Sequence, residues 1–237
     1  KGLKILMTIP LEIINLSKTY DSKEAVRNIS FKLNENEIIG ILGPNGCGKT
    51  TTIGMILGLL KPTQGRVLIN GIEIEKQRVE LLNELNFISP YIELPKKLTV
   101  KQNLEVYGRL YDEKKFKIKI DYLCEKLRLN EFINKITGEL SSGQKNRVSL
   151  AKSIINDPSV LLLDEPTASL DPETGDFVRS FLEEYQKEKK TSILLASHNM
   201  AEVERLCSSV LMMNKGSIID QGTPGELIKK HGRRNME

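Results

Sequence analysis

The sequence predicts an α/β fold with a mainly parallel sheet, an N-terminal antiparallel β layer and a helical insertion subdomain. Short apolar segments typical of buried strands alternate with helical patterns in the first and last parts of the chain. Two segments near the start alternate apolar and polar residues, as half-buried antiparallel strands do. The middle, at about residues 90–140, has apolar residues at helical spacing and few strand signals.

The first third of the chain supplies the antiparallel layer. Residues 11–16 alternate in part and residues 25–33 alternate cleanly, so each segment is predicted to be a strand. Residues 17–22 between them are polar and are predicted to form a turn. Residues 65–74 contain Asn-Gly between apolar flanks, which predicts a hairpin.

The middle of the chain is predicted to be helical. Residues 99–102 fit a capping box, and Val100, Leu104 and Tyr107 follow at helical spacing. The segment also carries a run of lysines, which we interpret as a solvated face rather than a lipid or nucleic-acid surface. These lysines are Lys114, Lys115, Lys117 and Lys119.

The last hundred residues return to alternating strands and helices. Residues 160–165 form an apolar run that ends in two carboxylates, and residues 192–197 form a second apolar run. Asp171-Pro172 predicts a helix start, with aspartate as the N-cap and proline at the first position. A terminal hairpin and a short capped helix are predicted at 210–220 and from 223.

Length and composition limit the classes of protein to which the chain can belong. The chain has 237 residues, enough for one domain or two closely packed ones, and a net charge of +4, too small to indicate a nucleic-acid partner. Cys47, Cys124 and Cys207 are scattered and odd in number, which argues for reduced cytosolic thiols rather than a disulfide framework or metal site. No stretch approaches the roughly 20 apolar residues of a membrane span, and no signal peptide is evident. Residues 1–7 are interpreted as a leader or an expression remnant.

The strongest motif is Gly-Pro-Asn-Gly-Cys-Gly-Lys-Thr at 43–50, which fits the phosphate-binding P-loop G-x-x-x-x-G-K-[ST]. A predicted buried strand at 37–42 precedes it, and a predicted helix at 51–60 follows. Glycines allow the backbone N–H groups to approach an anion, and the helix N-terminus adds partial positive charge. In this motif Lys49 reaches the β- and γ-phosphates and Thr50 ligates Mg²⁺. The alternative is a glycine-rich turn that binds nothing.

Two carboxylates end the apolar run at 160–165. Asp164 is expected to hold Mg²⁺ through water. Because successive side chains of a strand point to opposite faces, Glu165 points in another direction and is expected to polarise the water that attacks the γ-phosphate. The alternative is an acidic strand end at the surface. His198 follows the run at 192–197; it is either a structural histidine or a residue that reaches the γ-phosphate.

For two further features, residue spacing alone does not decide between a structural role and ligand binding. Ser141 and Gln144 have capping-box spacing before an amphipathic helix, and such a helix start is also a good anion site. Tyr20 is the aromatic residue of the polar segment 17–22, either a stacking platform for a base or a half-buried edge tyrosine.

The order of these motifs resembles the nucleotide-binding subunit of ATP-binding cassette (ABC) transporters, over about residues 11–228. Besides the P-loop, the resemblance is carried by Leu-Ser-Ser-Gly-Gln at 140–144, Leu-Leu-Leu-Asp-Glu-Pro-Thr at 161–167, Ser-Leu-Asp at 169–171, and His198. It implies that Glu165 is the catalytic base, His198 the switch histidine and Lys49 a third catalytic residue, with Thr50 and Asp164 at the metal. The implied nucleotide-binding residues are Tyr20, Val26, Gly43, Pro44, Asn45, Gly46, Cys47, Gly48, Lys49, Thr50 and Thr51, with Ser141, Ser142, Gly143, Gln144 and Asp171 facing a partner cassette.

The resemblance also implies an architecture and partners. It implies one P-loop NTPase domain at 8–230, with the core and β layer at 8–88 and 142–230 and the helical subdomain at 89–141. It implies ATP and Mg²⁺ as cofactors, a second cassette and an integral membrane permease as partners, no nucleic acid, and a peripheral position on the cytoplasmic face of the membrane. The segment 107–111 and the short tail after residue 224 look more like exporter than importer ATPases.

This sequence departs from the family pattern at two positions. Ser142 replaces the first of two glycines usual in the motif at 140–144, and Pro90 stands where the family places a glutamine. A proline side chain can neither ligate Mg²⁺ nor accept a hydrogen bond, so this departure bears on the coupling between nucleotide and partner. A soluble ABC-type ATPase acting on ribosomes or DNA is the alternative function, although such proteins usually carry two cassettes or a long coiled coil. A P-loop GTPase is disfavoured because the chain has no Asn-Lys-x-Asp motif, and a P-loop kinase because Glu165 beside Asp164 favours attack by water over phosphoryl transfer to a substrate.

Overall fold

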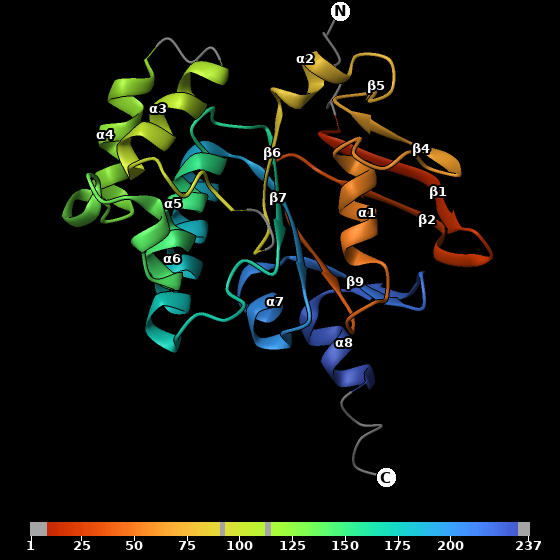
Figure 1. Cartoon of the computed structure of the whole chain (residues 1–237). Helices are drawn as coiled ribbons and strands as arrows, with labels where there is room; N and C mark the ends of the chain where they lie inside the picture. The colour runs from red at the N-terminus through yellow and green to blue at the C-terminus, as the bar shows by residue number, and fades with distance from the viewer. Residues whose placement is uncertain (1–8, 91–92, 112–114, 232–237) are drawn as a thin grey trace, which may run out of the picture. The chain divides into compact units, whose positions relative to one another are not determined.

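The computed structural model of the chain describes residues 9–90, 93–111 and 115–231 (Figure 1). Lys114 and residues 1–7, interpreted above as a leader or an expression remnant, lie outside the described residues. The chain forms two compact units, one up to Leu82 and again from Ser192 onward, the other Asn83–Thr191. Both units mix helices and strands, and the predicted α/β class is confirmed. The boundaries expected for the helical subdomain, 89–141, stay a prediction.

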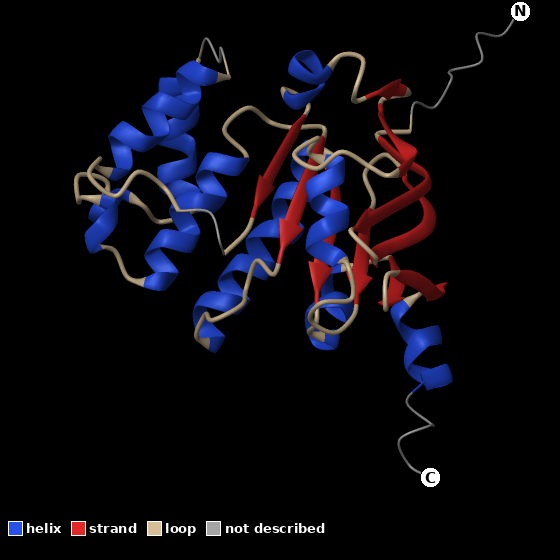
Figure 2. Ribbon diagram, turned by 45° about the vertical axis from the view of Figure 1, so that its right-hand side comes forward, coloured by secondary structure: helices blue, strands red, loops and turns tan. Residues whose placement is uncertain are grey.

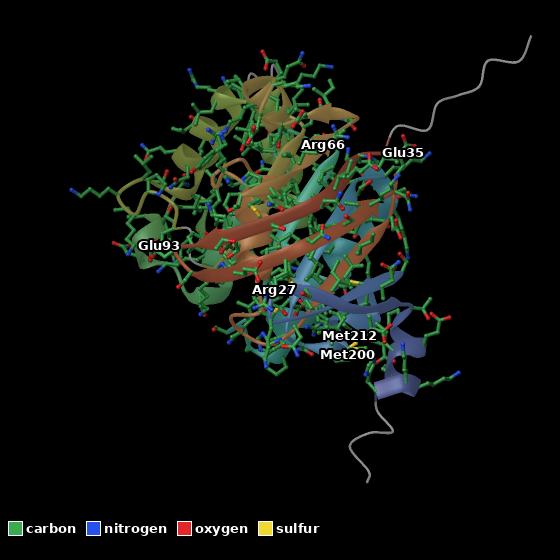
Figure 3. The ribbon with its side chains drawn as sticks, turned by 90° about the vertical axis from the view of Figure 1, so that its right-hand side faces the viewer. Arg27, Glu35, Arg66, Glu93, Met200 and Met212 are labelled. Atoms are coloured by element: carbon green, nitrogen blue, oxygen red, sulfur yellow. The ribbon has the colours of Figure 1, made fainter. Side chains whose placement is uncertain are left out.

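An antiparallel sheet occupies the start of the first unit, as predicted. Its strand order is β2 (Lys23–Leu33), β1 (Leu11–Tyr20), β4 (Gln64–Ile69) and β5 (Ile72–Glu73). Leu11 pairs with Leu33 on one side and with Ile69 on the other, and all three are fully buried. Figure 3 looks onto this sheet, with Arg27 of β2 and Arg66 of β4 labelled.

The turn predicted at 17–22 is wrong for residues 17–20, which continue β1. Lys18 pairs with Val26 and Tyr20 with Lys23, so the ladder extends almost to the tip of the hairpin. Pairing across the strands outweighs the weak strand preference of this polar segment. The hairpin predicted at 65–74 is confirmed, and its turn residues Asn70 and Gly71 have φ of 50° and 77°, which the Asn-Gly pair tolerates.

The first unit also holds a second set of strands. β3 (Ile38–Leu42) pairs in parallel with β8 (Ser192–Ser197) and with β9 (Ser209–Asn214), and β10 (Ser217–Gly222) pairs antiparallel to β9. The side chains of β8 are all buried, which matches its apolar sequence. The helices of this unit are α1 (Lys49–Ile56), α2 (Arg78–Leu82), α7 (Met200–Leu206) and α8 (Pro224–His231).

The second unit is mainly helical, as predicted for the middle of the chain. Its strands β6 (Leu85–Ile88) and β7 (Val160–Asp164) pair in parallel. Its helices are α3 (Val100–Leu110), α4 (Phe116–Lys126), α5 (Ser142–Ser153) and α6 (Pro172–Lys189), with short 3₁₀ turns η1 (Asn130–Phe132) and η2 (Thr137–Glu139); Figure 2 draws the helices of the chain in blue and the strands in red.

The lysine run of the middle segment is only in part a solvated face. Lys115 and Lys117 are exposed, as expected. Lys119 instead has a side chain only 11% exposed and forms an ion pair with Asp157. Lys119 departs from the expectation because α4 turns its side chain toward the rest of the unit, where a carboxylate balances its charge. Within the described residues, no helix combines the length and apolarity needed to cross a membrane.

Candidate nucleotide-binding site

The segment 43–48 forms a tight loop between β3 and α1. Gly46 and Gly48 have φ of 77° and 115°, backbone conformations that residues with a Cβ rarely adopt. Gly43 is required for a different reason, since a Cβ there would stand 2.2 Å from the Met213 carbonyl oxygen. The glycines of the motif therefore let the loop turn tightly and pack directly onto β9.

Lys49 lies across this loop. Its ammonium donates hydrogen bonds to the carbonyl oxygens of Gly43 at 2.6 Å and Pro44 at 3.4 Å, and the residue is only 6% exposed. The N-cap of α1 is Gly48, so no side chain of the described chain caps this helix start, and its first turn carries no acid. Main-chain N–H groups and a cation thus meet at one helix N-terminus, an arrangement suited to a polyphosphate.

The neighbouring strands fix the loop from behind. The Cys47 carbonyl accepts a hydrogen bond from Gly216 N at 2.9 Å, and the Gly216 carbonyl accepts one from Arg27 N at 2.7 Å. Val26, named from the resemblance, is fully buried, and its Cγ2 lies 3.4 Å from where a Cβ on Gly48 would stand. The hairpin β9–β10 and strand β2 therefore hold the shape of the loop.

Tyr20 is placed by the structure at the end of β1. Its side chain is 43% exposed, and Lys18 Nζ lies 5.0 Å from the ring centroid. An exposed ring beside a cation can stack on an aromatic base, and a half-exposed edge tyrosine can look the same. Its role stays a prediction.

His198 emerges beside the first glycine of the loop. It follows β8, whose last residue, Ser197, pairs in register with Leu42 of β3. The Ser197 carbonyl accepts a hydrogen bond from Gly43 N at 3.4 Å, and His198 itself is exposed. Because β3 and β8 are parallel, their carboxyl ends meet at one edge, and the phosphate loop and His198 leave from that edge.

The acidic residues predicted to handle metal and water lie in the second unit. Asp164 is the last residue of β7 and is 2% exposed, and Glu165 follows with φ of 52°. A cavity of about 280 Å³ in this unit is lined by Glu165, Pro90 and Ser142. The structure thus brings together the predicted catalytic base, the proline in place of glutamine, and the helix start at 142.

The segment 141–144 begins α5 as a full capping box. Ser141 Oγ accepts a hydrogen bond from Gln144 N at 3.2 Å, and Gln144 Oε1 accepts one from Ser141 N at 3.1 Å. Asp171 caps α6 by accepting from Thr174 N at 2.9 Å, a bond that lowers the pKa of this carboxyl group. The two capped helix starts, at Ser141 and Asp171, therefore belong to one unit.

The expected metal ligands divide between the units. Thr50 belongs to the first unit and Asp164 to the second, so their pairing around one ion stays a prediction from sequence. A hydroxyl and a carboxylate are hard oxygen donors of the kind Mg²⁺ takes, so the donor set fits that ion.

Sequence reasoning missed two residues near His198. Ser197 is fully buried and Glu202 is 2% exposed, and the serine hydroxyl donates to Glu202 Oε2 at 2.7 Å. The available signal was that Glu202 stands between the apolar residues Ala201 and Val203. Because charged residues also stand at Glu204 and Arg205, nothing in the sequence singled out Glu202.

Comparison with known proteins decides the family. The family described as "ABC transporter" matches residues 26–168, more than half of the chain. The chain belongs to the ABC transporter family. The resemblance noted from the motifs is thereby confirmed.

Relatives of this ABC cassette cover nearly all of its length. It is 35% identical to the ABC transporter ATP-binding protein NatA of Bacillus subtilis, over 95% of this chain and 94% of that protein. It is 36% identical to the Nod factor export ATP-binding protein I of Rhizobium etli, over 92% of this chain and 69% of the relative. The cassette is therefore an ATP-binding subunit of this transporter family.

Solved structures agree in fold. The structure of an ATP-binding subunit of an ABC transporter superimposes with a TM-score of 0.86 at 27% identity, covering 94% of each chain. That of cbiO1 from Clostridium perfringens, described as part of the ABC transporter complex cbiONQ, gives a TM-score of 0.83 at 31% identity, over 96% of this chain and 94% of that one.

Proposed function

We propose that this ABC cassette hydrolyses ATP in the presence of Mg²⁺ and so energises a membrane transporter that exports its substrate. One observation carries the nucleotide part of the proposal. Two left-handed glycines, an uncapped helix start and the Lys49 ammonium form a single cationic cradle at 43–50. A cradle of that kind suits the β- and γ-phosphates of a nucleoside triphosphate.

Roles follow from the chemistry of the side chains. Thr50 and Asp164 would hold Mg²⁺, which neutralises charge between the β- and γ-phosphates when bound. Glu165 polarises the attacking water, and His198, at the edge where the loop begins, contacts the γ-phosphate. Tyr20 stacks on the adenine.

The working unit that we propose is a pair of cassettes. The segment 141–144 is a capped helix start with exposed residues, and in the proposed dimer it meets the γ-phosphate held by the other cassette. ATP binding would close the pair and hydrolysis would reopen it.

A separate integral membrane permease would supply the transport pathway, and the cassette would sit at the cytoplasmic membrane face. The helical region 89–141 is the proposed docking surface. Export is favoured because several relatives are named Nod factor export ATP-binding proteins.

Two substitutions test the proposal in the purified protein. Lys49→Ala should abolish nucleotide binding and turnover, while Lys32→Ala, which removes an exposed lysine paired with Glu12, should not. Glu165→Gln should keep ATP binding, stop turnover and accumulate a dimer detected by light scattering. Near-normal ATPase activity of Lys49→Ala would contradict the nucleotide assignment, and undiminished turnover of Glu165→Gln would contradict the role of that carboxylate.

A further inference from the structure

Two buried polar residues, Ser197 and Glu202, lie on either side of His198 in the sequence. Ser197 is fully buried and Glu202 is 2% exposed, and Ser197 Oγ donates a hydrogen bond to Glu202 Oε2 at 2.7 Å. The same hydroxyl oxygen accepts a hydrogen bond from Asn199 N at 3.0 Å. These two bonds therefore tie together the residues on either side of His198.

The direction in which the Ser197 hydroxyl points its proton depends on the Glu202 carboxyl group. A serine hydroxyl has one proton to donate and lone pairs with which to accept. When its proton points to Glu202, the lone pairs are left to accept from the Asn199 N–H. An apolar side chain of the same length could fill the space of Glu202, but it could not set this direction.

Helix α7, which follows the turn, is held by contacts that do not involve the Ser197 hydroxyl. Asn199 Oδ1 accepts hydrogen bonds from Ala201 N at 3.0 Å and Glu202 N at 3.4 Å, which fixes the start of α7. Val203 in the same helix and Cys207 at its C-cap lie 3.0 Å from where a Cβ on Gly40 of β3 would stand. Helix α7 is thus fixed against the strand that leads into the phosphate loop.

We propose that Glu202 is a positioning residue for His198. Through the Ser197 hydroxyl it fixes the main chain of the turn 197–199, so that the imidazole projects from the sheet edge beside Gly43. The inference rests on the proposed function in one respect, the contact of His198 with the γ-phosphate. The position of the imidazole itself does not depend on that contact.

The chain offers a direct readout, because His198 and His231 are its only histidines. Protein labelled with ¹³C at histidine gives two imidazole signals, which the variant His231→Gln assigns. Glu202→Met keeps the side-chain length and removes the acceptor, whereas Glu202→Gln keeps an acceptor oxygen. Ser153→Ala is the matched control, because Ser153 is also fully buried and its hydroxyl donates to the Leu150 carbonyl at 2.8 Å.

Glu202→Met should shift or broaden the His198 signal and leave that of His231 in place, while Glu202→Gln and Ser153→Ala should leave both unchanged. In steady-state ATPase assays Glu202→Met should lower kcat about tenfold or more, with KM for ATP within about twofold, since misplacing a reacting group affects the chemical step. Ser197→Ala carries the same expectations and replaces Glu202→Met if that variant does not fold.

An unchanged His198 signal in both Glu202→Met and Ser197→Ala would overturn the inference. So would an equal disturbance in Glu202→Gln, because the retained acceptor would then be irrelevant. Failure of the proposed function looks different: the parent protein would show no ATPase activity, and MgATP would not move the His198 signal, whatever the variants do to it.

Discussion

Thr174 lies directly against Gly143, so that a Cβ on the glycine would stand 3.2 Å from Thr174 Cγ2 and 3.3 Å from its Oγ1. Gly143 is in the first turn of α5 and Thr174 is in the first turn of α6, where it donates its N–H to Asp171. The starts of the two helices are therefore packed against each other at a position where a larger residue has little room.

Gly143→Ala should consequently gain less stability than a helical glycine normally does. Alanine at Gly225, where no atom lies within 4 Å of the added Cβ, should stabilise the protein by about 0.5 kcal/mol. At Gly143 the contact with Thr174 should cancel this gain. The double variant Gly143→Ala/Thr174→Ser, which removes Cγ2, should restore it. Urea denaturation measures all three, and equal gains at the two glycines would contradict the packing argument.

Ser141→Ala and Thr99→Ala form a matched pair. Each removes the N-cap hydroxyl of a complete capping box, at α5 and α3 respectively, so each should destabilise the protein by about 1 kcal/mol. Only Ser141→Ala should also lower ATPase activity, because only this helix start is proposed to face a phosphate.

The pair separates the two interpretations of the segment 141–144. Equal activities at equal loss of stability would reduce Ser141 to a helix cap. A selective loss in Ser141→Ala, with Thr99→Ala close to the parent, supports the phosphate role. Activity must be measured well below both unfolding transitions.

Pro90→Gln should not reduce ATPase activity. Pro90 is exposed and lines the cavity of about 280 Å³ that Glu165 also lines, so a glutamine side chain has room to enter it. Removing the proline should lower stability by no more than about 1 kcal/mol, through the greater freedom of the unfolded chain. ATPase rates and urea midpoints measured side by side check this, and a large loss of activity at unchanged stability would show that the proline has a positive role.

Asp220 predicts a pH dependence of stability. Hydrogen bonds from Lys230, at 2.7 Å, and His231, at 2.6 Å, lower the pKa of this carboxyl group to about 2. A lowered folded-state pKa stabilises the native state above the unfolded-state value of about 3.9, and this stabilisation is lost as the pH falls toward 2. The Tm difference between the parent and Asp220→Asn should therefore be constant at pH 5–6 and narrow below pH 4. Asp21→Asn, in the exposed β1–β2 turn, is the control, and a difference independent of pH would contradict the assignment.

The sequence was sufficient wherever a local rule determines the structure. The strand, glycine loop and helix at 37–56, the capping boxes at 99–102, 141–144 and 223–226, and the Asn-Gly hairpin all follow from neighbouring residues, and each was predicted. The predicted helix at 51–60 ends at Ile56 because the chain turns at Gly58, with φ of 63°.

Features that depend on distant residues were not predictable. Residues 17–20 are in a strand because residues 18–20 pair with β2 and Ser17 pairs with Gln64 of β4, and the Lys119 side chain is only 11% exposed because Asp157 lies opposite. The burial of Glu202 depends on Ser197 at the end of another element. No periodicity in one segment encodes such pairs, so the support behind His198 could only be found in three dimensions.

All three native thiols are shielded from solvent, with exposures of 3% at Cys47, 4% at Cys124 and 7% at Cys207. Burial raises the pKa of each thiol, and at Cys207, where the Glu202 charge adds to it, the pKa reaches about 12. Very little reactive thiolate is then present at neutral pH. A single cysteine introduced on an exposed strand or helix can therefore carry a spin label or fluorophore without prior removal of the native ones, which opens this cassette to spectroscopic distance measurements during turnover.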